Sequence, residues 1–175
     1  MDYLTGKKII YYTLIDLSLP LGPSVNELSF VRDMSRRYGA NFVVVCPRPA
    51  RISHLFPKNC RYEYIPIREI EKNSYQFFEL RLKGIFSLRK QLKDIPPESS
   101  VVVSRLSILD VPAWFSRREL SRRSFFVRHS GNGLFENFAT KSVIHSSVAK
   151  LAERINRMIL ESADCIDFLN KNNQA

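Results

Sequence analysis

The stretch Lys7-Lys8-Ile9-Ile10-Tyr11-Tyr12-Thr13-Leu14 carries the first fold signal in this chain of 175 residues. Its β-branched and aromatic residues follow one another without polar alternation, which is the pattern of a strand buried on both faces. Residues 41–46 form a second run of this kind, closed by Pro47. Residues 24–38 between the two runs predict a helix. Because a helical crossover joins the two strands, we expect them to pair in parallel.

The predicted helix has its own start and stop signals. Ser24 and Glu27 have the spacing of a capping box, in which each side chain satisfies a free backbone N–H group. Gly39 is placed to end the helix. The apolar residues on one helical face are Leu28, Val31, Met34 and Tyr38. These signals complete one β-loop-α-β unit.

Strands and helices continue to alternate after this unit. Further strands are expected at residues 61–67, 99–104, 124–129 and 164–169. Pro66 favours an edge position for the first of them. Helices are expected at residues 75–93, from the cap Asp110 to about Leu120, and along the stripe Ile144, Val148, Leu151, Ile155, Met158 and Ile159. No break in composition divides the chain, so the sequence predicts one α/β domain over residues 1–175, with a mostly parallel sheet of about six strands.

Composition excludes several classes of protein. The chain has 27 Lys and Arg against 17 Asp and Glu, a formal net charge of +10, but 45% hydrophobic residues exclude a wholly disordered chain. Cys46, Cys60 and Cys165 have no CxxC spacing and predict reduced thiols in a cytoplasmic protein. A secretion signal is not evident, and no apolar run reaches the roughly 18 residues of a membrane span.

Ligands of parallel α/β sheets bind beyond the carboxyl ends of the strands, which directs attention to residues 15–24, 104–110 and 129–140. In the first loop, Gly22 precedes a helix start, where free N–H groups favour an anion such as a diphosphate, and Asp16 supplies a carboxylate. An ordinary turn at residues 21–23 explains the same loop. Since neither GxGxxG nor GxxxxGK[ST] is present, a Rossmann dehydrogenase and a P-loop enzyme are disfavoured.

His129 stands at the end of the fifth predicted strand and is the candidate catalytic residue. Its imidazole can bind a phosphate or a sugar hydroxyl, or exchange a proton near neutral pH. A structural hydrogen-bonding role is the alternative. Arg105, after the fourth strand, and Asn132, in the last loop, are candidates for substrate binding at the same edge, although ordinary solvent exposure also accounts for Arg105 and Arg128. With no GxSxG or HExxH motif, we predict no hydrolase site, no metal site and no cofactor.

Positive charge gathers in two segments. The basic residues are Arg81, Lys83, Arg89, Lys90 and Lys93 in the first segment, and Arg117, Arg118, Arg122 and Arg123 in the second. The first segment interleaves its charges with apolar residues, which is typical of a helix that lies on an anionic membrane or binds an anionic acceptor. Apolar packing into the core, with the charges in solvent, is the alternative. Nucleic acid is disfavoured because no recognised binding motif accompanies the charge.

The order of these segments resembles the N-terminal domain of GT-B-fold glycosyltransferases of the retaining group 1 type. The similar segments are residues 8–14, Leu21-Gly22-Pro23, Met34-Ser35-Arg36-Arg37-Tyr38-Gly39, Val101-Val102-Val103-Ser104-Arg105, Phe125-Phe126-Val127-Arg128-His129 and residues 153–166. They cover nearly the whole chain. Two departures stand out: Ser104-Arg105 replaces a usual histidine after the fourth strand, and Leu21-Gly22 replaces a pair of glycines.

The resemblance implies a Rossmann-like three-layer domain that forms the acceptor-binding half of a hexosyltransferase. The donor would be a nucleotide sugar and the acceptor a glycan or a lipid-linked molecule, with Gly22 facing the donor diphosphate and His129 near the acceptor. The nucleotide-sugar domain is absent from residues 1–175, so the chain alone is predicted to be inactive. The resemblance also implies a cytoplasmic location at the inner face of the membrane. The alternative function is a non-catalytic basic α/β module that binds an anionic membrane or a protein partner.

Overall fold

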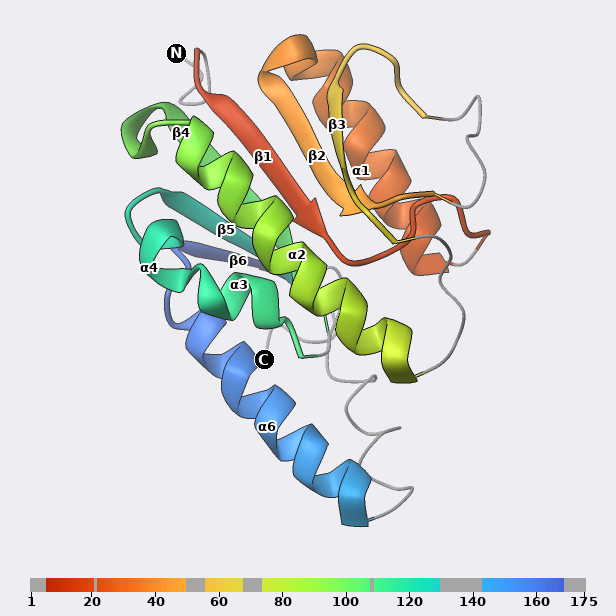
Figure 1. The fold of residues 1–175 in the computed structure, drawn as a ribbon. Helices are drawn as coiled ribbons and strands as arrows, with labels where there is room; N and C mark the ends of the chain where they lie inside the picture. Colours follow the sequence, from red (N-terminus) through yellow and green to blue (C-terminus); the bar gives the residue numbers. More distant parts are fainter. Residues whose placement is uncertain are drawn as a thin grey trace.

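A six-stranded, all-parallel sheet forms the centre of the computed structural model, which describes residues 6–20, 22–49, 56–67, 74–107, 109–129 and 143–168. Its strand order is β3-β2-β1-β4-β5-β6 (Figure 1). The strands are β1 (Lys8–Thr13), β2 (Phe42–Pro47), β3 (Arg61–Ile65), β4 (Ser100–Arg105), β5 (Ser124–His129) and β6 (Cys165–Phe168). The predicted Rossmann-like α/β class, the parallel pairing and the edge position of β3 are confirmed.

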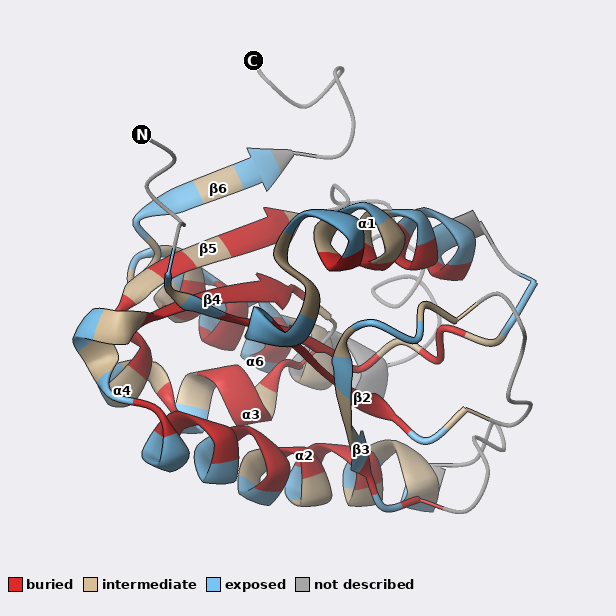
Figure 2. Cartoon of the chain, turned by 90° about the horizontal axis from the view of Figure 1, so that it is seen from above, coloured by how far each residue is buried: buried red, intermediate tan, exposed pale blue. Residues whose placement is uncertain are grey.

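Helices cover both faces of the sheet and complete three layers (Figure 2). Helix α1 (Gly22–Tyr38) lies on one face. The other face carries α2 (Ser74–Asp94), α3 (Val111–Phe115), α4 (Arg117–Leu120) and α6 (Val143–Leu160). Two short 3-10 turns, η1 (Gly39–Asn41) and η2 (Pro97–Ser99), precede β2 and β4. None of the described helices is long and apolar enough to cross a membrane.

Side-chain alternation in β1 divides the core into two parts. Ile9 and Tyr11 pack under α1, whereas Ile10 and Tyr12 pack under the helices of the other face, and all four are fully buried. β1 therefore needs apolar or aromatic side chains from Ile9 to Tyr12, which is why this strand is easy to recognise in the sequence. Cys46, Cys60 and Cys165 are unpaired, as predicted.

Three local predictions are wrong. α1 begins at Gly22, so Ser24 lies inside the helix and the predicted capping box does not mark its start. The helix predicted from Asp110 to Leu120 is two short helices, because Ser116 has φ −96° and ψ 4°, outside the α-helical region. Leu151, placed on the core stripe of α6, is 52% exposed. Ile155 and Ile159 of the predicted stripe do lie in the core, and Ala152 joins them there in place of Leu151.

Candidate functional site

The carboxyl ends of β1 and β4 lie side by side at the centre of the sheet. β1 pairs with both β2 and β4, so the chain leaves β1 toward one half of the sheet and leaves β4 toward the other. This reversal of strand order is where open α/β sheets bind ligands. The last residues of β1, β4 and β5 are Thr13, Arg105 and His129, so the strands bring two of the predicted site residues to this edge.

His129 ends β5 and is half-buried. Burial lowers the pKa of its imidazole, and the positive charge of Arg105 lowers that pKa further. The imidazole is therefore held neutral near neutral pH, a state in which one ring nitrogen accepts a hydrogen bond or a proton.

Arg105 ends β4 and is only 3% exposed. Its Nη1 donates a hydrogen bond to the backbone oxygen of Arg128, the residue before His129, over 3.4 Å. Its Nε lies 3.1 Å from Oε1 of Glu27. Arg105 and Arg128 pair in register and point to the α1 face, and both are buried, so solvent exposure does not describe either of them.

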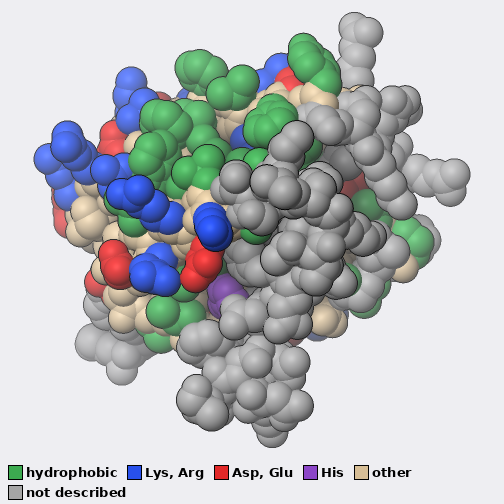
Figure 3. Space-filling model, turned by 90° about the horizontal axis from the view of Figure 1, so that it is seen from below, with side chains coloured by type: hydrophobic (Ala, Val, Ile, Leu, Met, Phe, Trp, Pro, Cys, Tyr) green, Lys and Arg blue, Asp and Glu red, His purple; other side chains and the backbone are tan. Residues whose placement is uncertain are grey.

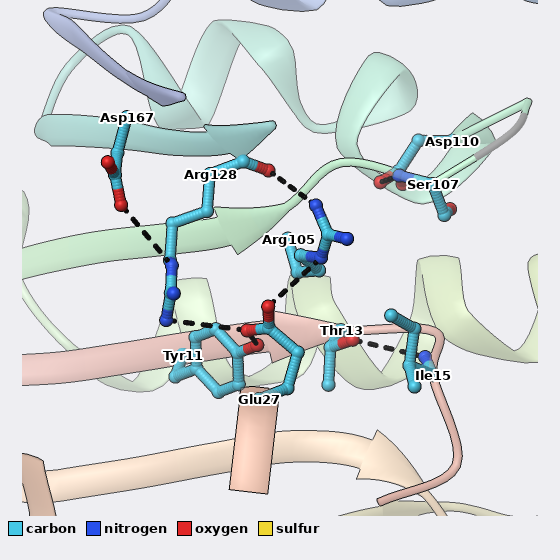
Figure 4. A network of polar contacts seen from close by, with 9 residues as sticks. All are labelled: Tyr11, Thr13, Ile15, Glu27, Arg105, Ser107, Asp110, Arg128 and Asp167. Atoms are coloured by element: carbon cyan, nitrogen blue, oxygen red, sulfur yellow. Dashed lines mark hydrogen bonds and ion pairs between the residues drawn. The ribbon is translucent and has the colours of Figure 1, made fainter. Parts of the chain in front are cut away.

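Glu27 is the centre of a buried charged cluster beneath α1 (Figure 4). Its Oε2 accepts a hydrogen bond from the hydroxyl of Tyr11 and lies 3.4 Å from Nη1 of Arg128. Arg128 continues the cluster, because its Nε is 3.5 Å from Oδ2 of Asp167 and its guanidinium lies 3.7 Å from the ring centre of Phe30. Glu27 is thus the buried counter-ion of Arg105 and Arg128. Its spacing from Ser24 predicted a different role, in a capping box.

The loop after β1 is held by its own side chains. Oδ1 of the buried Asp16 accepts hydrogen bonds from the backbone N–H and the hydroxyl of Ser18, at 2.8 and 2.7 Å. Oγ1 of Thr13 accepts a hydrogen bond from the backbone N–H of Ile15 at 3.0 Å. The carboxylate of Asp16 therefore shapes the loop that leads into Gly22, the first residue of α1. Asn132 lies outside the described residues.

A second buried polar cluster, which the sequence did not reveal, lies at the same edge on the other face. Asp110 caps α3 by accepting a hydrogen bond from the N–H of Ala113, and burial raises the pKa of its carboxyl to about 6. Nε of Arg81 donates to the backbone oxygen of Leu109 at 2.9 Å, and burial lowers the pKa of that guanidinium to about 10. Leu109 has φ 53°, a conformation that a leucine rarely adopts.

Two of the nine residues assigned to a basic surface are buried and play a structural part. Arg81 is held in the cluster just described, and Nη2 of Arg123 donates to the backbone oxygen of Ile95 at 2.8 Å, beyond the end of α2. The residues that remain at least partly exposed are Lys83, Arg89, Lys90, Lys93, Arg117, Arg118 and Arg122.

Among the described residues, no group of three His, Cys, Asp or Glu side chains is arranged to hold a metal ion. The carboxyl edge presents a neutral imidazole at His129 and backbone N–H groups at the start of α1, with the buried guanidinium of Arg105 behind them. These groups suit a polar ligand with hydroxyls and negative charge.

Comparison of the chain with protein families, with characterised proteins and with solved structures finds no match.

Proposed function

We propose that this chain is the N-terminal, acceptor-binding half of a GT-B-type glycosyltransferase, which moves a hexosyl group from a nucleotide sugar to a glycan or a lipid-linked acceptor with retention of configuration. One observation carries the proposal. His129 and Arg105 end adjacent strands beside the reversal point of a sheet ordered 3-2-1-4-5-6, which is where ligands of such sheets bind. The sequence resemblance supplies the class of reaction.

Each group at the edge has a part in such a transfer. The transition state combines oxocarbenium character with a departing diphosphate. A neutral His129 accepts a hydrogen bond from a hydroxyl of the acceptor or of the transferred sugar. The N–H groups at the start of α1 stabilise the leaving diphosphate. The proposal also requires a second domain that binds the nucleotide sugar, and it places the enzyme in the cytoplasm at the inner face of the membrane.

The test joins the chain to a nucleotide-sugar-binding domain, either the continuation of its reading frame or the product of an adjoining gene expressed with it. Release of UDP or GDP is followed with a panel of UDP- and GDP-hexoses. We expect no turnover from the isolated chain and turnover from the joined protein. His129→Ala should lower kcat about 100-fold, the lower end of the contribution of a proton-transferring group.

Arg36→Ala provides the matched control, since Arg36 is an exposed residue of α1. It should leave kcat unchanged. Full activity of the His129→Ala protein would remove His129 from the proposal. Failure of the joined protein to release nucleotide from any donor would overturn the transferase assignment.

The second candidate function, a non-catalytic basic module on an anionic membrane, is favoured by a single observation. The large apolar side chains of α2 that remain in solvent share a helix with several cations. Persistent vesicle binding without any nucleotide release would favour this second function. This surface of α2 is compatible with either function.

A further inference from the structure

Helix α2 carries apolar side chains on two opposite faces. One face packs on the sheet through Leu80, Leu88 and Leu92. The other face holds four large apolar side chains in solvent, with exposed fractions of 76% at Tyr75, 52% at Phe78, 58% at Leu82 and 74% at Phe86. Packing in the core explains the first face only. A contiguous exposed apolar patch of this kind marks an interaction site in soluble proteins.

The exposed stripe of α2 continues into positive charge. With 3.6 residues per turn, Arg89 and Lys93 fall on the same helical face as Tyr75, Phe78, Leu82 and Phe86. These six residues are called the α2 surface below. Its first three turns are apolar and its last two are basic, so the charge and the apolar stripe are parts of one surface.

Neighbouring segments extend both properties of the α2 surface. Nη2 of Arg89 donates to the backbone oxygen of Phe115 at 3.3 Å, which brings a further aromatic ring, 47% exposed, next to the helix. The bonds of Arg123 anchor the segment after α4, which contains the exposed Arg122, to the end of α2. In the view from below, hydrophobic side chains and Lys or Arg side chains lie beside one another on the described part of the surface (Figure 3).

Acidic residues neutralise only part of this charge. Glu79 pairs with Lys83, Glu63 with Lys90 and Glu119 with Arg89, at N–O distances of 2.6, 2.9 and 3.7 Å. Lys93, Arg118 and Arg122 have no ion pair with any residue that the structure describes. The surface therefore keeps a net positive charge beside its aromatic rings.

We propose that the α2 surface binds an anionic lipid bilayer. A straight stripe on an outward-facing helix matches a flat apolar layer, aromatic rings suit the headgroup boundary, and cations at one end attract acidic lipids. Charge complementarity selects an anionic membrane over a neutral one. The proposal is independent of the transfer reaction, because it uses none of the residues at the carboxyl edge.

The direction of α2 places its aromatic end near that edge. Arg81 bonds to Leu109, just beyond the carboxyl end of β4, whereas Leu92 bonds to Arg123, just before the start of β5. The helix therefore runs from the carboxyl edge of the sheet to the amino edge (Figure 1). When the domain rests on its α2 surface, the aromatic end of that surface therefore lies at the same edge of the sheet as His129. If the proposed transferase function holds, a lipid-linked acceptor is then the acceptor class.

Vesicle flotation of the full chain tests the proposal, with phosphatidylcholine vesicles prepared with and without phosphatidylglycerol. The chain should float only with the anionic vesicles, and added salt should weaken binding. The double variant Phe78→Ser, Phe86→Ser should lower the partition coefficient about tenfold or more through lost apolar burial. Arg89→Gln with Lys93→Gln should lower the partition coefficient about tenfold through lost charge.

Tryptophan fluorescence gives a second measurement of binding. Trp114, the single tryptophan, stacks edge-on against Phe115, so its emission should shift to shorter wavelength when the chain binds anionic vesicles.

Leu151→Ser is the matched control, because Leu151 has the same 52% exposure as Phe78 but lies on α6. It should bind vesicles like the unchanged chain. Far-ultraviolet circular dichroism of each variant confirms that the fold is kept. Absence of binding to anionic vesicles, equal binding to neutral vesicles, or equal losses in the Leu151 control and the α2 variants would each overturn the proposal. None of these outcomes depends on nucleotide release, so the transferase proposal stands or falls separately.

Discussion

The two faces of the sheet hold buried charge in different ways. On the α1 face, Glu27 lies between two guanidinium groups, 3.1 Å from Arg105 and 3.4 Å from Arg128. On the other face, the guanidinium of Arg81 bonds to backbone oxygens and Asp110 bonds to a backbone N–H. Direct pairing supports the charge in the first cluster, and backbone dipoles support it in the second. Burial raises the pKa of Asp110 to about 6, so the backbone hydrogen bond from Ala113 and the charge of Arg81 offset burial only in part.

Removal of the shared carboxylate should have the largest effect. Glu27→Ala leaves Arg105 and Arg128 buried without their common counter-ion, and breaking a buried pair in this way costs about 3–5 kcal/mol. Urea unfolding measures the change. Glu79→Ala is the control, since it removes a partly exposed partner of Lys83 and should cost less than about 1 kcal/mol. Equal losses of unfolding free energy in the two variants would contradict the prediction that the buried carboxylate contributes more to stability than the partly exposed one.

The second face should show the next largest effect, as a dependence on pH. The pKa of Asp110 is about 6 in the folded chain and about 3.8 for an ordinary aspartate, so the folded state binds the proton more tightly. Stability from this group is therefore full below about pH 4 and is lost as pH rises through 6, by about 3 kcal/mol. Asp110→Asn keeps a capping side chain and should remove this component. The measurement is the difference between the unfolding free energies of the two proteins from pH 4 to pH 7; a constant difference would contradict the prediction.

Adjacent tyrosines of β1 give a smaller and closely matched test. Tyr11 and Tyr12 are both fully buried, but Tyr11 donates to Glu27, whereas the hydroxyl of Tyr12 has no hydrogen-bond partner among the described residues. Tyr11→Phe should cost about 1.5–3 kcal/mol, the range for a hydrogen bond to a charged group, and Tyr12→Phe should change stability by less than about 1 kcal/mol. Urea unfolding of the two variants measures the difference between their losses of stability. A larger loss of stability in Tyr12→Phe than in Tyr11→Phe would contradict the prediction.

The smallest expected effect crosses from one face to the other. Arg105 belongs to the α1 cluster, yet its charge lowers the pKa of His129, whose side chain points to the opposite face because residues alternate along β5. Arg105→Gln should therefore raise the pKa of His129, observed by NMR titration of its imidazole. Lys93→Gln removes a charge from the α2 surface and should leave that pKa unchanged. An unchanged pKa of His129 in the Arg105 variant would show that the charge of Arg105 on one face does not affect the imidazole on the other.

The sequence alone predicted those strands in which consecutive residues are buried. β1 and β2 are covered on both faces, so burial constrains every residue except the exposed Lys8, and the strands can be recognised from the sequence. The same logic led to His129 and Arg105, because the end of a strand follows from the strand itself.

Roles that depend on distant partners could not be predicted. Glu27 fits a capping box by spacing, and only the arrival of Arg105 and Arg128 from far along the chain makes it a counter-ion. On α2, the spacing of Tyr75, Phe78, Leu82 and Phe86 was visible, but the sheet decides which apolar face it covers. The two-sided apolar pattern was the available signal, and it indicates an interaction surface once one face is taken by the core.

The pairing of β1 with β4 has a consequence for biosynthesis. Lys8 aligns with Ser100, so one hydrogen-bonding edge of the central strand β1 stays unpaired until the ribosome makes β4, about 90 residues later. At a synthesis rate of about 5–20 residues per second, this edge stays open for roughly 5–20 seconds. An open edge of this kind recruits other strands. The central position of β1 in the finished sheet thus means that one of its two edges stays unpaired until β4 has been made, although β2 can already pair with the other.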